Sequence, residues 1–158
     1  MAYHFQRAGT VSVTLTPVFY AVAMAVSGIG SLAFGRMFDR AGIGLLIPLT
    51  VVAAAYAPLV FLGGLWASLV GVSLWGLGMG IHESIIPAAV APMVSPDRRA
   101  AAYGLFTGVH GTAWVAGSVV IGALFNVSLV ALAAFAVVAD LAAVPLLLAV
   151  RRRSARGA

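Results

Sequence analysis

The stretch Leu74-Trp75-Gly76-Leu77-Gly78-Met79-Gly80-Ile81-His82-Glu83-Ser84-Ile85-Ile86-Pro87 places a carboxylic acid and an imidazole inside an apolar run long enough to cross a lipid bilayer. An acidic side chain near the bilayer centre costs roughly 2.5 kcal/mol or more to insert, so it usually faces a water-filled cavity or a partner. Glycines at alternate positions precede Glu83 and leave room for a neighbouring helix or a substrate. The stretch therefore predicts a membrane-spanning helix that carries function.

The composition predicts an integral membrane protein. Hydrophobic residues make up 63% of the chain, charged residues 8%, and the mean hydropathy is +1.10, which leaves too little polar surface for a soluble domain. The net charge of +5 comes from arginines clustered at the ends of apolar runs. Such clusters indicate membrane orientation, so we expect the lipid bilayer and no nucleic acid as partner. No cysteine is present, which excludes disulfides and thiolate metal sites.

Apolar runs separated by short polar segments predict an all-α, polytopic protein with five transmembrane helices. The expected spans are residues 17–38, 43–62, 66–91, 100–125 and 128–150, within one transmembrane domain over residues 1–150. Residues 1–15 are mixed in character and are expected to form an aqueous loop. Residues 151–158 are expected to form a basic cytoplasmic tail.

Proline and glycine mark the expected boundaries. Thr16-Pro17 predicts a capped helix start, and Pro48 and Pro58 predict kinks in the second span. Pro92 and the segment Ser95–Arg99 break the apolar pattern before the fourth span.

The arginines predict the orientation. Eight of the nine basic residues fall in the loops near 36–40 and 98–99 and in the tail, which five spans would place on one side. By the positive-inside rule that side is the cytoplasm, so the C-terminus is expected inside and Met1 outside the cell membrane. A chain whose N-terminus faces outward without a visible signal peptide suggests that at least one transmembrane helix precedes it.

The loop Gly35-Arg36-Met37-Phe38-Asp39-Arg40-Ala41-Gly42 resembles the short cytoplasmic loop motif of the major facilitator superfamily. Gly35 and Gly42 are expected to let the chain turn, while Asp39, followed by Arg40, can face the positive end of a neighbouring helix. The trailing basic pair of the family is absent, which fits the looser copy of the motif in the second half of such carriers.

The segments Pro96–Phe106 and Trp75–Ser84 resemble the same transporters, in particular bacterial members. By this resemblance the five spans correspond to helices eight to twelve, and Met1–Arg7 to the outer end of helix seven. The resemblance implies a secondary carrier of a small molecule that works by alternating access, and a chain that lacks the N-terminal half. The missing half or a second copy of the chain is then the expected partner. The alternative is a non-transporting assembly or regulatory subunit that reuses a transporter half.

Three ionisable residues within the spans are candidates for substrate or proton coupling. Glu83 lies near the centre of the third span, where a buried hydrogen bond between helices is the competing interpretation. His82 lies about 100° around the helix from Glu83, so the two side chains cannot point the same way. His110 lies near the middle of the fourth span. Asp140, in the fifth span, is assigned a structural contact because the last helix of the family is usually peripheral.

Small residues at intervals of four predict close helix packing. One series contains Gly76 and Gly80, and the other contains Gly104 and Gly108. The chain has no nucleophile elbow, no phosphate loop and no clustered metal ligands in its sequence, so no enzyme, cofactor or metal is expected.

Overall fold

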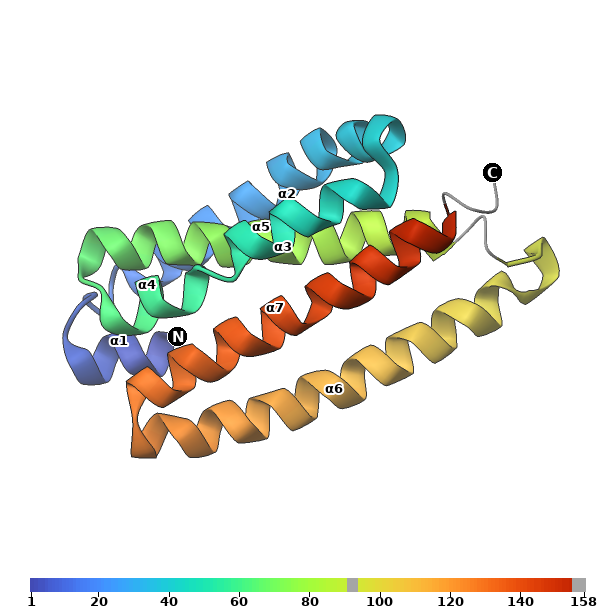
Figure 1. Ribbon diagram of the computed structural model, residues 1–158. Coiled ribbons are helices and arrows are strands. Elements are labelled where there is room, and N and C mark those ends of the chain that lie inside the picture. Colours follow the sequence, from blue (N-terminus) through green and yellow to red (C-terminus); the bar gives the residue numbers. More distant parts are fainter. Residues whose placement is uncertain (91–93, 155–158) are drawn as a thin grey trace.

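The structure, a computed structural model, is a bundle of long helices that run alternately in opposite directions (Figure 1). It describes residues 1–90 and 94–154, except for the side chains of residues 85–87, 89, 90, 153 and 154. Every regular element in this described part is helical, which confirms the all-helical prediction. The expected break at Pro92 lies outside the described residues.

The N-terminal segment differs from the expected aqueous loop. It forms the short helix α1 (Ala2–Ala8), which ends at Gly9 with φ 64°. His4 and Phe5 are buried, and the His4 ring lies 5.1 Å from that of Phe61 in an edge-on arrangement. Burial lowers the pKa of His4 and favours its neutral form. Aromatic packing therefore holds α1 against the bundle, a constraint that the mixed composition of the segment did not reveal.

The second helix, α2 (Thr16–Ala41), extends beyond the expected span and contains most of the loop motif. Gly35 is helical and not a turn residue, which corrects the expectation for this position. The chain turns only at Gly42, whose φ of 59° favours glycine because it has no Cβ. Asp39 and Arg40 lie exposed on the last turn of α2. The hydroxyl of Thr16 donates to the backbone oxygen of Ser12 and does not cap the helix.

The segment after Gly42 returns antiparallel to α2 in Figure 1 as a short 3-10 turn, η1 (Gly42–Leu45), and two helices, α3 (Leu46–Ala53) and α4 (Tyr56–Leu62). The helical hydrogen bonding is interrupted at residues 54–55. The ring of Pro58 would clash with the carbonyl of the residue four positions earlier, which explains a break at this place. The kink expected in this run is a short turn that divides it into two helices, with the N–H of Ala54 still bonded to the oxygen of Thr50.

Three long helices complete the bundle. They are α5 (Leu65–Val90), α6 (Arg99–Val127), which follows the 3-10 turn η3 (Pro96–Arg98), and α7 (Leu129–Ser154). Ser128 separates α6 from α7, and its hydroxyl accepts a hydrogen bond from the backbone N–H of Ala131 at 3.2 Å. The first residues of the expected tail, up to Ser154, continue α7 as helix.

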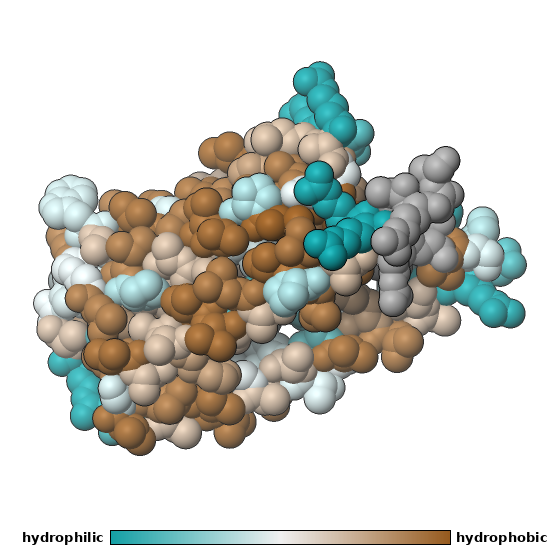
Figure 2. All heavy atoms as spheres, viewed as in Figure 1, coloured by the Kyte–Doolittle hydropathy of each residue, from teal (hydrophilic) through white to brown (hydrophobic). Residues whose placement is uncertain are grey.

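Four helical stretches of the described chain are long and apolar enough to cross a membrane, namely Thr16–Leu62, Leu65–Ser84, Pro96–Val127 and Leu129–Arg152. The first contains both α2 and the α3–α4 pair, between which the chain reverses direction (Figure 1). Figure 2 shows that apolar residues cover the middle of the visible face. Hydrophilic residues gather toward the end where α2 and α7 finish and α6 begins. This distribution is compatible with a membrane protein.

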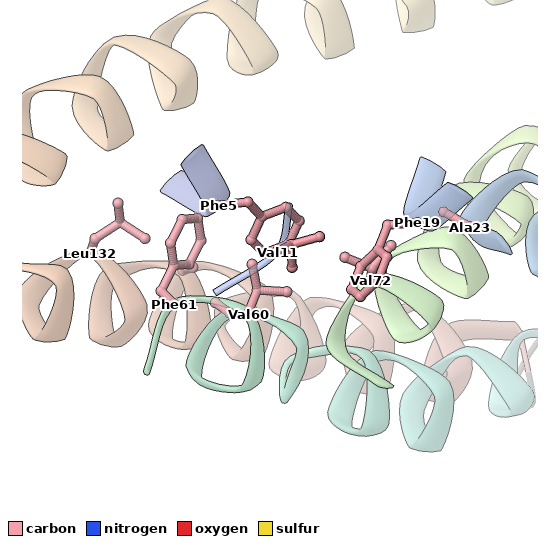
Figure 3. Packing of buried hydrophobic residues seen from close by; sticks show 10 residues of the cluster. Phe5, Val11, Phe19, Ala23, Val60, Phe61, Val72 and Leu132 are labelled. Atoms are coloured by element: carbon pink, nitrogen blue, oxygen red, sulfur yellow. The ribbon is translucent and has the colours of Figure 1, made fainter. Parts of the chain in front are cut away.

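The core lies at the end of the bundle that holds α1 (Figure 3). Phe5 of α1 packs edge-on against Phe19 of α2, with ring centroids 5.6 Å apart. Val60 of α4 is fully buried, and Leu132 of α7 is fully buried as well. These contacts tie the N-terminal segment to helices from both halves of the chain.

The closest helix contact joins α2 and α5 at two glycines. A Cβ on Gly80 would lie 2.5 Å from the backbone oxygen of Ser27, and one on Gly76 would overlap with the backbone of Ala23. The hydroxyl of Ser31 lies 2.8 Å from the carbonyl oxygen of Ser27 on its own helix and 3.1 Å from that of Gly80 on α5, so its one hydrogen is shared across the contact. The glycines therefore allow backbone to approach backbone, as in other small-residue membrane interfaces.

We expect the substitution Gly80→Leu to separate α2 from α5, because its side chain has no space at this contact. Overpacking of this kind costs about 2 kcal/mol or more, so the thermal midpoint in detergent should fall by roughly 5 °C. The matched control is Gly108→Leu on α6, where nothing lies within 4 Å of an added Cβ. Equal midpoints for the two variants, measured by circular dichroism, would contradict the contact.

Candidate functional site

The structure brings together the three coupling candidates from two helices. His82 and Glu83 lie on α5, His110 lies on α6, and the rings of the two histidines have centroids 5.3 Å apart. The tilt between the ring planes is 35°. This proximity depends on the pairing of α5 with α6, so the spacing of the residues along the chain could not reveal it.

A cavity of about 370 Å³ opens beside these side chains. Its described lining residues are His82, Glu83, Tyr103, Phe106, Thr107 and His110. Phe106 stacks on His110 with centroids 5.9 Å apart and planes within 13°, and Trp114 lies 5.8 Å from His110 on its other side along α6. The imidazole of His110 is thus held between aromatic rings that limit its movement.

A second, larger cavity of about 730 Å³ shares His82, Glu83 and His110 with the first. Residues from α1 through α7 line it, and its volume lies in the range of small-molecule sites. The imidazoles and the carboxylic acid therefore stand where two hollow spaces meet within an apolar bundle. Groups of this kind can exchange protons with each other or bind a polar part of a ligand.

Asp140 also lines the larger cavity, from α7. Its charge acts on the phenol of Tyr56, which lines the same cavity from α4. Because the last helix of the family is usually peripheral, the family resemblance predicted a structural contact for Asp140. Its position inside an apolar run was the signal that could have placed it among the site residues.

The other sequence-predicted residues lie elsewhere. Gly35, Asp39, Arg40 and Gly42 line neither cavity and belong to the end of α2 and its turn. Gly76 and Gly80 face α2, as described above. Gly104 and Gly108 on α6 meet no atom of the described residues within 4 Å of an added Cβ, so their packing role stays a prediction.

No group of three or more histidine, cysteine, aspartate or glutamate side chains within the described ranges is arranged to hold a metal ion. The site among these residues consists of two imidazoles, two carboxylic acids and aromatic walls.

The chain is similar to longer mycobacterial proteins. It is 31% identical over 151 residues to uncharacterized proteins of Mycobacterium tuberculosis and Mycobacterium bovis. The match covers 96% of this chain but 37% of each relative, so the chain spans little more than a third of their length. No family model matches the chain. No solved structure matches it either.

The contact between His82 and His110 can be tested by cross-linking, because the chain has no cysteine of its own. We expect the pair His82→Cys and His110→Cys to react with a short bis-maleimide in membranes, since the native rings lie 5.3 Å apart. The cross-link is measured by intact mass as the addition of one linker per chain with both thiols blocked, since separate reaction at each thiol adds two linkers.

The matched control pairs His82→Cys with Leu105→Cys, a residue of α6 whose side chain is 72% exposed. A control yield as high as that of the 82–110 pair would show that α5 and α6 lack the described arrangement.

Proposed function

We propose that this chain is the C-terminal portion of a secondary carrier of the major facilitator type, which moves a small molecule by alternating access. The observation that carries the proposal is the cavity between α5 and α6, which His82, Glu83 and His110 line on helices that are otherwise apolar. Ionisable residues within a membrane usually line the path of a substrate, an ion or a proton. Carriers hold such sites near the middle of the membrane between helices that move.

Two further observations support the proposal. The helices α2, α5, α6 and α7 and the α3–α4 pair, taken as one, form five passes along the bundle. Five helices of a twelve-helix carrier are about two fifths of its length, close to the 37% of the relatives that the chain covers. The motif Gly35–Gly42 forms the end of α2 and the turn at Gly42 that leads into the next of these passes.

The arginines support a cytoplasmic C-terminus in the cell membrane. Arginines occur on the last turns of α2, in η3 and at the start of α6, and near the end of α7, and these helix ends lie toward one end of the bundle in Figure 1. The helix α1, which contains Arg7, lies at the opposite end. A cluster of basic residues at one end of the spans marks the cytoplasmic side.

The packing suggests how such a carrier would move. Of the helices that line the smaller cavity, α5 is fixed to α2 by glycine contacts, whereas none of the described side chains of α6 is buried. A helix held by few contacts can shift at small cost, while α5 keeps Glu83 and His82 in place. One half alone cannot enclose a central site, so transport requires the remaining half of the carrier or a second copy of this chain.

The test uses the complete carrier that contains this chain and needs no known substrate. We expect the variant Ser118→Cys, which lines the larger cavity on α6, to react with a membrane-impermeant maleimide added from either side of the membrane. Access from both sides arises because an alternating carrier opens the same cavity to each side in turn. Labelling is measured separately in right-side-out and inside-out vesicles.

The matched control is the neighbouring Val119→Cys, whose side chain is 67% exposed on the apolar surface and does not line the cavity. It should remain unlabelled from both sides because lipid covers it. Labelling of Ser118→Cys from one side only would overturn the carrier assignment and favour the non-transporting subunit.

A further inference from the structure

We propose that the larger cavity binds a hydrophobic organic cation, with Glu83 and Asp140 as its counter-charges. The proposal names the substrate class for the proposed carrier and rests on that function. It follows from three properties of the cavity, which are its charge, its aromatic walls and its size.

Two acidic side chains line the cavity, together with the histidines His82 and His110 and the N-terminal residue Met1. Glu83 of α5 and Asp140 of α7 are carboxylic acids on different walls, and no lysine or arginine is among the described lining residues. The described arginines lie at the end of α1, on the last turns of α2, in η3 and at the start of α6, and near the end of α7. A cation in this space would gain attraction from two carboxylates, whereas an anion would meet repulsion that the low-dielectric surroundings strengthen.

The walls of the cavity are rich in aromatic rings. Trp75 of α5 and Trp114 of α6 contribute indoles, and Phe19 and Tyr20 contribute further rings from α2. Aromatic faces attract cations most strongly where water is excluded, with tryptophan the best of the three ring types. The same rings bind the apolar part of an amphipathic ligand, so charge and hydrophobic surface are recognised in one space.

The size and the supporting polar group fit such a ligand. A volume of about 730 Å³ accommodates a molecule with several rings. Tyr56 of α4 lines the same cavity as Asp140 of α7 and adds a phenol to its polar lining. A small inorganic cation would leave most of the apolar wall without a partner, which favours an organic ion.

The test measures binding of tetraphenylphosphonium to the full 158-residue chain in phosphatidylcholine nanodiscs at pH 8, by equilibrium dialysis against empty nanodiscs. Tetraphenylborate has the same shape and the opposite charge, so it isolates the contribution of charge. Histidine in reference peptides is mainly neutral at this pH, which leaves the carboxylates as the dominant charges. We expect saturable binding of the cation above the empty discs and none of the anion.

The variants Glu83→Gln and Asp140→Asn should each weaken binding of the cation by about tenfold, because each removes one counter-charge from an apolar site. The control Asp97→Asn, in η3 outside both cavities, should bind as the unchanged chain does. Trp114→Leu keeps both carboxylates and changes a side chain that is 51% exposed, so it should fold and should weaken binding by roughly threefold. Thermal midpoints and helical circular dichroism establish folding for each variant.

The cation assignment would be overturned if the chain bound tetraphenylphosphonium and tetraphenylborate equally above the empty nanodiscs. It would also be overturned if Glu83→Gln, Asp140→Asn and Trp114→Leu bound the cation as the unchanged chain does. The proposed carrier function would still be supported in that case if Ser118→Cys is labelled from both sides of the membrane. Conversely, binding of the cation could depend on the carboxylates while Ser118→Cys is labelled from one side only. That outcome would contradict the proposed transport function and support the cation site.

Discussion

The approach of the α5 backbone to the α2 backbone is the contact on which the rest of the structure depends. Gly76 and Gly80 leave no Cβ between the helices, and the hydroxyl of Ser31 bonds across to the carbonyl of Gly80. In a membrane no water drives helices together, so close van der Waals contact and hydrogen bonds between helices must supply the association. A single side chain at either glycine would separate the pair.

This contact also decides which way the polar residues face. His82 follows Gly80 by two positions and therefore lies about 200° around the helix from it. With Gly80 held against α2, His82 is turned away from that helix and meets His110 of α6. The helical period of α5 therefore places His82 on the side opposite Gly80, while Glu83, seven residues after Gly76, lies nearer the glycine side. A tight rigid contact on one side supports a hollow, polar space on the other.

The helix on the far side of that space is held differently. The described residues of α6 include no buried side chain, and large apolar residues such as Leu105 and Val115 are exposed. In a bilayer such a surface is covered by lipid or by another protein segment. The cavity between α5 and α6 therefore has one firmly placed wall and one wall whose position depends on what surrounds it. This asymmetry suits a site that must open and close.

The sequence alone predicted the all-helical fold, the approximate extent of the apolar runs that are long enough to cross a membrane, and the close packing at Gly76 and Gly80. These properties depend on hydropathy, helical period and side-chain size, which are local and can be recognised along the chain. The tertiary structure decided what depends on helix neighbours. It paired His82 with His110, brought Asp140 to the cavity wall, docked α1 through His4 and Phe5, and left Gly104 and Gly108 without a described partner. The physical reason is that the period of a helix fixes which residues share a face, whereas only packing between distant segments fixes what that face meets.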